Sequence, residues 1–176
     1  MIQPPKEAHG GQLDPKLVDP DATLNEKNYK EFVKEVLDTH NKYRKIHGVP
    51  PLEMKKEISE YSKNWANSLA KMKRMAHSKI EDRPTYGENV YYANLKYVPG
   101  SLPVHSWYSE AKEENYKYGM EPPNLRAGHF TQVVWKSSKY LGVGAVSWDK
   151  GIFIVCNYEP RGNIIGKFTE NVLSPK

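Results

Sequence analysis

The stretch GHFTQVVWKSS, residues 128–138, decides the fold. It opens on His129, places Thr131 and Gln132 within the next helical turn, and then runs into apolar bulk. Polar and apolar residues mixed over such a short span predict a short helix. A histidine at the start of that helix either does chemistry or fills space, and the rest of the chain must show which.

The chain has the length and composition of one globular domain. It holds 176 residues, of which 38% are hydrophobic and 11% aromatic. Residues 1–23 differ from the rest, because they contain four prolines, a Gly-Gly pair and no apolar periodicity. Such a segment buries too little surface to offset its ordering entropy. We therefore predict a flexible extension over 1–23 and one domain over 24–176, which carries the positive net charge.

The sequence lacks the usual marks of secretion and of membrane insertion. No segment has the pattern of a signal peptide, and no apolar run approaches the roughly 18 to 20 residues that a spanning helix needs. Cys156 is the one cysteine, and there is no Asn-x-Ser/Thr acceptor. We expect an intracellular, cytoplasmic protein; the alternative is a secreted protein whose signal peptide lies outside this sequence.

Hydrophobic periodicity predicts helices before strands. Apolar residues at three-to-four spacing indicate helices over 25–46, about 55–76 and 104–118, with Thr23 and Glu26 as a capping box and Gly48 as a stop. Residues 87–98 are typical of a short strand or an irregular segment. Residues 140–148 and 151–160 alternate with period two around Asp149-Lys150-Gly151, which predicts a β-hairpin. This order favours an α+β domain or an α/β/α sandwich. In GVGAVS, small residues at 142 and 144 would let a neighbouring element approach the strand.

Common catalytic motifs are absent, but His and Glu residues recur at the edges of predicted elements. There is no Gly-x-Ser-x-Gly, no phosphate-binding glycine loop and no His-Glu-x-x-His. Two imidazoles and two carboxylates could bind a divalent ion such as zinc, or form a proton-transfer pair. Spacing alone leaves open that each is a solvated or capping residue. The four candidates are His77, Glu88, Glu110 and His129.

Two segments resemble the signatures of a known family. GHFTQVVWKSS is similar to the first signature of the CAP superfamily (cysteine-rich secretory proteins, antigen five and pathogenesis-related one), and FIVCNYEPRGNI, residues 153–164, is similar to its second. HNKYRKIHGVPPL, HS, GEN and WYSE follow in the family's order, so the resemblance runs from about residue 28 to the end. It is greatest to the non-secreted branch, with the Golgi-associated plant pathogenesis-related proteins and the helminth venom-allergen-like proteins without signal peptides.

The resemblance implies both a fold and a site. The fold would be α/β, a three-layer α-β-α sandwich with a central antiparallel sheet and a large cleft. His77 and His129 would ligate zinc or another divalent cation, with Glu88 and Glu110 close by. Two imidazoles give a weak, exchangeable site, whose affinity should fall below about pH 6.5 as protons compete. The alternative is that His129 orients the cleft through hydrogen bonds, without metal.

The leading functional hypothesis is a non-enzymatic protein that binds lipids or sterols. The resemblance implies sterol, fatty-acid or acidic-phospholipid ligands and association with Golgi membranes, although Met1-Ile2 excludes the myristoylation that aids it in relatives. Basic residues along the second predicted helix would attract an anionic membrane, unless they form a merely solvated face. They are Lys55, Lys56, Lys63, Lys71, Lys73 and Arg74. Tyr91 and Tyr92 would belong either to an apolar sterol loop or to the core.

Two other classes of function compete with lipid binding. A metal-dependent hydrolase or protease could use a glutamate of the tetrad as general base. A homodimeric interaction scaffold is the third hypothesis. We expect no nucleic-acid partner, because acids interrupt the basic residues and no nucleic-acid-binding signature appears.

Two residues near the second signature have simpler interpretations. Cys156 shares a strand face with Ile152, Ile154 and Tyr158, which predicts a buried thiol. Arg161 and Asn163 should fasten the loop that leaves the strand.

Overall fold

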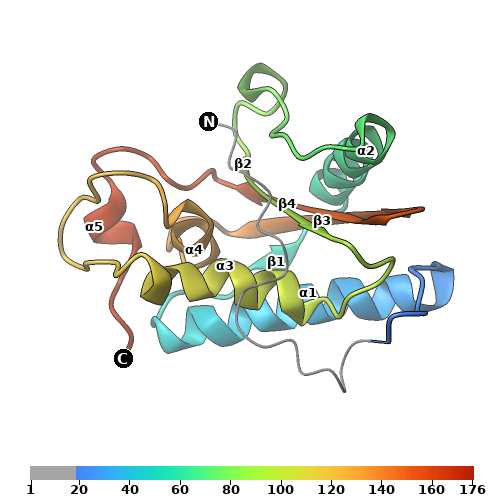
Figure 1. The fold of residues 1–176 in the computed structure, drawn as a ribbon. Helices are drawn as coiled ribbons and strands as arrows, with labels where there is room; N and C mark the ends of the chain where they lie inside the picture. Colours follow the sequence, from blue (N-terminus) through green and yellow to red (C-terminus); the bar gives the residue numbers. More distant parts are fainter. Residues whose placement is uncertain (1–18) are drawn as a thin grey trace.

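The structure, a computed structural model, describes residues 19–176, so most of the predicted extension over 1–23 lies outside it. Helices and strands alternate irregularly along the chain (Figure 1). The helices are α1 (Glu26–Ile46), α2 (Lys56–Met72), α3 (Ser101–Glu113), α4 (Gly128–Val133) and α5 (Phe168–Asn171), with a 3-10 turn η1 (Ile80–Asp82). The strands are β1 (Glu53–Met54), β2 (Gly87–Ala93), β3 (Tyr140–Trp148) and β4 (Gly151–Glu159).

Helix α1 begins at a different cap from the one predicted. Asn25 accepts hydrogen bonds from the first-turn amides, and Asn28 reaches back to the Asn25 amide, so this pair forms the capping box. The prediction of Thr23 and Glu26 was wrong, because Thr23 contributes only its carbonyl to the two asparagine amides. Gly48 follows the helix with φ of +67°, a conformation that favours glycine.

Three predicted helix boundaries were wrong for local reasons. Helix α2 ends at Met72 rather than near residue 76, because Lys73 turns left-handed with φ of 57°. Helix α3 starts three residues before the predicted Val104, since Pro103 falls in its first turn, where proline is tolerated. It ends at Glu113 rather than at Tyr118, and Asn115 has φ of 49° just beyond.

Four strands form one sheet in the order β1-β3-β4-β2. The predicted hairpin is confirmed: β3 and β4 are antiparallel from Tyr140 opposite Glu159 to Trp148 opposite Gly151. Strand β2 pairs antiparallel with β4 and is an edge of the sheet. The sheet is not wholly antiparallel, because the two residues of β1 pair parallel with β3. Nothing in the apolar pattern marks so short a strand.

Helices cover both faces of this sheet, as the predicted α-β-α sandwich requires. Helix α2 lies on one face, and α1, α3 and α4 lie on the other (Figure 1). A Cβ on Gly142 or Gly144 would collide with the α2 backbone, so the predicted role of small residues in close approach is confirmed.

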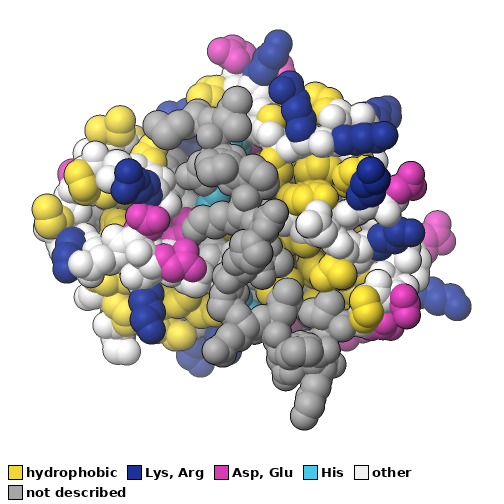
Figure 2. Space-filling model, viewed as in Figure 1, with side chains coloured by type: hydrophobic (Ala, Val, Ile, Leu, Met, Phe, Trp, Pro, Cys, Tyr) yellow, Lys and Arg dark blue, Asp and Glu magenta, His cyan; other side chains and the backbone are white. Residues whose placement is uncertain are grey.

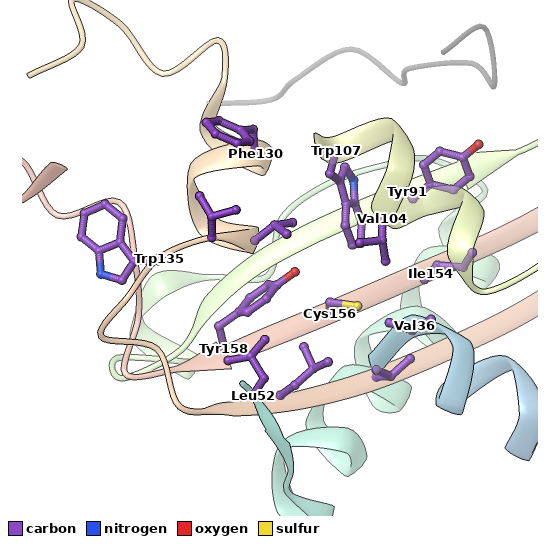
Figure 3. Packing of buried hydrophobic residues seen from close by; sticks show 14 of the residues in the cluster. Val36, Leu52, Tyr91, Val104, Trp107, Phe130, Trp135, Ile154, Cys156 and Tyr158 are labelled. Atoms are coloured by element: carbon purple, nitrogen blue, oxygen red, sulfur yellow. The ribbon is translucent and has the colours of Figure 1, made fainter. Parts of the chain in front are cut away.

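The larger core cluster lies between the sheet and α1, α3 and α4 (Figure 3). Cys156 is fully buried there with Ile152, Ile154 and Tyr158, as predicted, and burial raises the pKa of its thiol. On the α2 face, Val90, Phe153 and Val155 pack against Ala66 and Leu69. The strands alternate between these two clusters with period two.

Candidate metal centre

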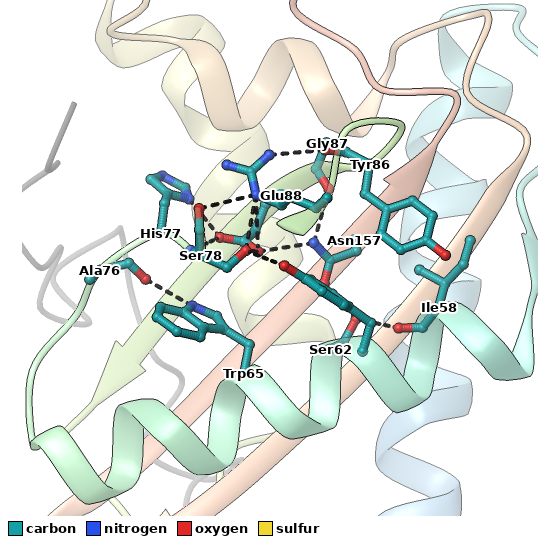
Figure 4. A network of polar contacts seen from close by, with 12 residues as sticks. Ile58, Ser62, Trp65, Ala76, His77, Ser78, Tyr86, Gly87, Glu88 and Asn157 are labelled. Atoms are coloured by element: carbon teal, nitrogen blue, oxygen red, sulfur yellow. Dashed lines mark hydrogen bonds and ion pairs between the residues drawn. The ribbon is translucent and has the colours of Figure 1, made fainter. Parts of the chain in front are cut away.

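The first His–Glu pair lies on the α2 face of the sheet. His77 Nδ1 is 3.0 Å from Glu88 Oε1, and the two side chains differ in exposure, 31% for His77 and 0% for Glu88 (Figure 4). Helix α2 has already ended at Met72, so the segment that carries His77 is free to turn back toward β2. Trp65 fastens that segment, since its Nε1 donates to the carbonyl of Ala76 at 3.0 Å.

Glu88 accepts hydrogen bonds at both oxygens. Oε1 also accepts from the Ser78 amide at 2.8 Å, and Oε2 accepts from Ser78 Oγ at 2.6 Å and from Asn157 Nδ2 at 3.0 Å. Arg83 Nε lies 3.5 Å from Oε2. Burial raises the pKa of Glu88, but the hydrogen bonds and the nearby guanidinium outweigh burial and hold the pKa below its usual value. The carboxylate therefore stays ionised beside His77.

The second pair lies on the opposite face. His129 Nδ1 is 2.8 Å from Glu110 Oε2, and both side chains are buried. The other oxygen of Glu110 accepts from the backbone amides of His129 and Phe130, at 3.0 and 3.2 Å. These amides belong to the first turn of α4, where no preceding helical carbonyl is available. Glu110 thus caps α4 from α3 and orients the His129 ring at the same time.

Further contacts fasten the short helix α4 at both ends. Buried Arg44 of α1 donates to the carbonyls of Val133 and Trp135 at its C-terminal end, at 3.1 and 2.8 Å. At its start, Asn163 donates to the Gly128 carbonyl at 2.8 Å and accepts from Thr131 Oγ1 at 2.6 Å. The prediction that Asn163 fastens its loop is confirmed.

Strand β2 links the two pairs. Glu88 holds His77 through its side chain, and the next residue, Asn89, donates from Nδ2 to the His129 carbonyl at 3.1 Å. Successive side chains of a strand point to opposite faces. Because β2 is an edge of the sheet, the two histidines lie on either side of the same edge. The structure thus places Glu88 on β2 and both histidines in contact with β2. Glu110 joins them through His129.

The geometry fits the chemistry of a metal-binding imidazole. A carboxylate next to Nδ1 accepts its proton, which leaves the lone pair on Nε2 for a cation; histidine ligands commonly have such a partner. Within residues 19–176, no three His, Cys, Asp or Glu side chains are grouped so that they could hold a metal ion. The side chains that the two pairs offer to a cation are the two imidazoles.

The six predicted basic residues do not form one outer face. Lys63 points inward: its Nζ donates to the Ala145 carbonyl at 2.9 Å and lies 4.2 Å from the Tyr29 ring centroid, and burial lowers its pKa. It lines a groove of about 710 Å³ between α1 and α2. Lys55 is paired with Glu159 at 3.2 Å. The exposed members are Lys56, Lys71, Lys73 and Arg74, and Figure 2 shows Lys and Arg side chains gathered over this part of the molecule.

Tyr91 and Tyr92 belong mainly to the core and the sheet. Tyr91 is 2% exposed, and Tyr92 is half-buried with its ring centroid 5.0 Å from that of Phe153. Of the two alternatives for these tyrosines, the core is confirmed for Tyr91.

Sequence reasoning missed the residues that support the four side chains. Ser78 and Asn89 are the immediate neighbours of His77 and Glu88, so adjacency alone could have suggested them. Arg44 gave another signal, since a charged residue within the apolar stripe of α1 must find buried acceptors. No sequence signal pointed to Asn157, because its role depends on the register of β2 against β4.

A family model matches most of the chain. The model described as CAP, the cysteine-rich secretory protein family, matches residues 37–158. The chain belongs to the CAP family. The matched range includes all four residues of the two His–Glu pairs.

Named relatives support the same assignment. Golgi-associated plant pathogenesis-related protein 1 of Homo sapiens is 40% identical over 150 residues, which cover 84% of this chain and 96% of that protein. Secreted protein RBT4 of Candida albicans is 34% identical over 159 residues, but this chain spans only 42% of its length. The crystal structure of NaASP2 with Zn²⁺ superposes with a TM-score of 0.68 at 21% identity, covering 90% of this chain and 91% of that one. The sandwich fold of this CAP protein is thereby shown.

Proposed function

We propose that this CAP protein is a non-enzymatic, divalent-cation-binding domain, with His77 and His129 as its ligands. The observation that supports the proposal is the matched arrangement of the two imidazoles at one strand edge, each with Nδ1 bonded to a buried carboxylate. A solved relative in this fold was crystallised with Zn²⁺, which agrees with the choice of metal.

The test is a zinc titration by calorimetry at neutral pH. Wild type is expected to bind one equivalent, and the double variant His77→Ala, His129→Ala none. His105→Ala is the matched control, because His105 is an exposed histidine outside both pairs. Equal binding by wild type and the double variant would contradict the proposal, as would no binding by wild type.

A hydrolase remains the competing function. It would need Glu88 or Glu110 as general base toward a metal-bound water. Both carboxylates are already engaged, Glu88 by four hydrogen bonds and the Arg83 guanidinium. Glu110 is engaged by two backbone amides and His129. We therefore expect no turnover of peptide or ester substrates with zinc present. Turnover that the double variant abolishes would overturn this part of the proposal.

The second part of the proposal is a lipid partner at a membrane surface. The exposed basic residues of α2 and its C-terminal end give the physical reason, since each lysine or arginine near an anionic leaflet contributes about 1 kcal/mol. Within residues 19–176 no helix is both long and apolar enough to cross a bilayer, so the proposed association is peripheral. The human relative's name includes Golgi association, and we propose a peripheral Golgi location here. Sterol ligands and a homodimer stay predictions.

A further inference from the structure

Four apolar side chains are exposed together at the end of the molecule beyond α4. Met120 is 52% exposed, Leu125 and Ile164 are each 40% exposed, and Ile165 is 87% exposed. They lie on two loops, residues 114–127 and 160–167. We call this group the Ile165 patch. On the left of Figure 2, hydrophobic side chains stand beside Lys and Arg on this end of the molecule.

Several contacts hold the two loops together. Glu121 of the first loop accepts from the Phe168 and Thr169 amides that follow the second, at 3.3 and 3.0 Å. A Cβ placed on Gly128 would lie 3.6 Å from Asn163 Nδ2 and 3.8 Å from Leu125 Cβ, so both loops meet at the start of α4. The exposed apolar side chains are therefore presented by a fastened surface.

The second loop lifts Ile165 to the tip of a tight turn. The Lys167 amide donates to the Ile164 carbonyl at 3.0 Å, and Gly166 has φ of +86°, as the third residue of a type II turn does. Ile165 is the second residue of this turn. That position does not require an apolar side chain. The backbone conformation therefore does not explain why an isoleucine is exposed here.

Basic side chains surround the patch, while the nearby acids are engaged. Arg126, Arg161 and Lys167 are exposed. The Glu121 carboxylate is occupied by the backbone amides, and Glu170 is paired with Lys167 at 3.3 Å. The patch thus has an apolar tip and a rim in which three basic side chains stand against two acidic ones; we call it the cationic rim.

We propose that the Ile165 patch is the surface that enters an anionic lipid bilayer. A convex apolar tip needs no complementary pocket in a bilayer, and anionic headgroups match the cationic rim. A protein partner would need a matching hollow over a standard interface of roughly 800 Å² a side. This inference rests on the lipid part of the proposed function, adds an apolar contact outside α2, and is independent of the metal.

The experiment measures partition onto phosphatidylcholine vesicles with and without phosphatidylserine, with EDTA present. Wild type should bind the vesicles that contain phosphatidylserine, and less so at high salt. Ile165→Ser should lower the partition coefficient about tenfold, because the variant has no apolar side chain at this position to transfer from water into the bilayer. Ile80→Ser is the matched control: Ile80 is 56% exposed on η1, away from the patch, and its replacement should change nothing.

A second measurement reports insertion directly. The natural Cys156 is fully buried, so a fluorophore on Ile165→Cys reports from the turn alone. Its emission should shift to the blue with anionic vesicles, whereas the same dye on Ile80→Cys should not shift. If wild type binds but Ile165→Ser binds equally well, this inference is wrong while the α2 surface stands. If wild type does not bind at all, the lipid proposal fails as well.

Discussion

The two His–Glu pairs use the same residue types for different purposes. Glu110 is built into the backbone of the molecule, because it supplies the acceptors that two first-turn amides of α4 lack. Glu88 instead accepts a single backbone amide, that of Ser78. Its other partners are side chains, of which Asn157 and Arg83 each have another acceptor (Figure 4). The comparison teaches that two similar site residues can contribute very different amounts to the stability of the fold.

The largest expected effect comes from removing the two carboxylates in turn. Glu110→Ala leaves the His129 and Phe130 amides buried without an acceptor, and we expect a loss of about 3 to 5 kcal/mol in the free energy of unfolding. Glu88→Ala should cost about 1 to 3 kcal/mol, because it takes the acceptor from one backbone amide, that of Ser78, instead of two. Asn157 still donates to the Gly87 carbonyl and Arg83 to that of Tyr86. Urea unfolding of both variants measures the difference. An equal loss of unfolding free energy in both variants would show that capping α4 adds no stability beyond that of the Glu88 network.

The two faces of the sheet should also respond differently to acid, because the groups that lose stability titrate in different pH ranges. On the α4 side, His40 is fully buried with Nε2 accepting from Tyr158 OH at 2.7 Å, and burial lowers its pKa from 6.5 to about 4. Between these values the unfolded chain takes up a proton that the folded chain does not, so stability falls as the pH falls through this window, by about 3 kcal/mol. On the α2 side, the pKa of Glu88 is lowered in the folded protein. The stability that Glu88 contributes is therefore lost only as the pH falls below the usual glutamate range.

The measurement is the free energy of unfolding against pH for wild type and His40→Gln. The glutamine has no titrating ring, so the stability of the variant should change less between pH 6.5 and about 4, whatever its absolute value. Some slope should remain, because burial also lowers the pKa of His47. Parallel curves for the two proteins would rule out His40 as the source of the acid sensitivity.

The comparison also shows which parts the sequence could predict. Period-two alternation over 140–159 predicted the hairpin, and the resemblance to a family picked out His77, Glu88, Glu110 and His129. The hydrogen-bond partners of each carboxylate could not be predicted, because they depend on tertiary contacts between distant segments, such as α3 with the start of α4. Helix ends failed at Lys73 and Asn115, where single residues adopt left-handed backbone that apolar periodicity does not encode. The inward direction of Lys63 was not predicted either, because it depends on a tertiary contact with the Ala145 carbonyl of β3.

The smallest expected effect tests the orienting role of Glu110 apart from its capping role. Glu110→Gln keeps one oxygen for the His129 and Phe130 amides, so the variant should lose less stability than Glu110→Ala. Its amide group would donate to His129 Nδ1, which moves the ring proton to Nε2, where a cation would otherwise bind. Zinc affinity should fall about 10- to 100-fold by calorimetry, as expected when such a histidine partner is changed. Glu113→Gln, on the same helix but exposed, is the control and should bind like wild type. Unchanged zinc affinity in Glu110→Gln would mean that Glu110 serves the fold alone, and that the tautomer of His129 is set by other contacts.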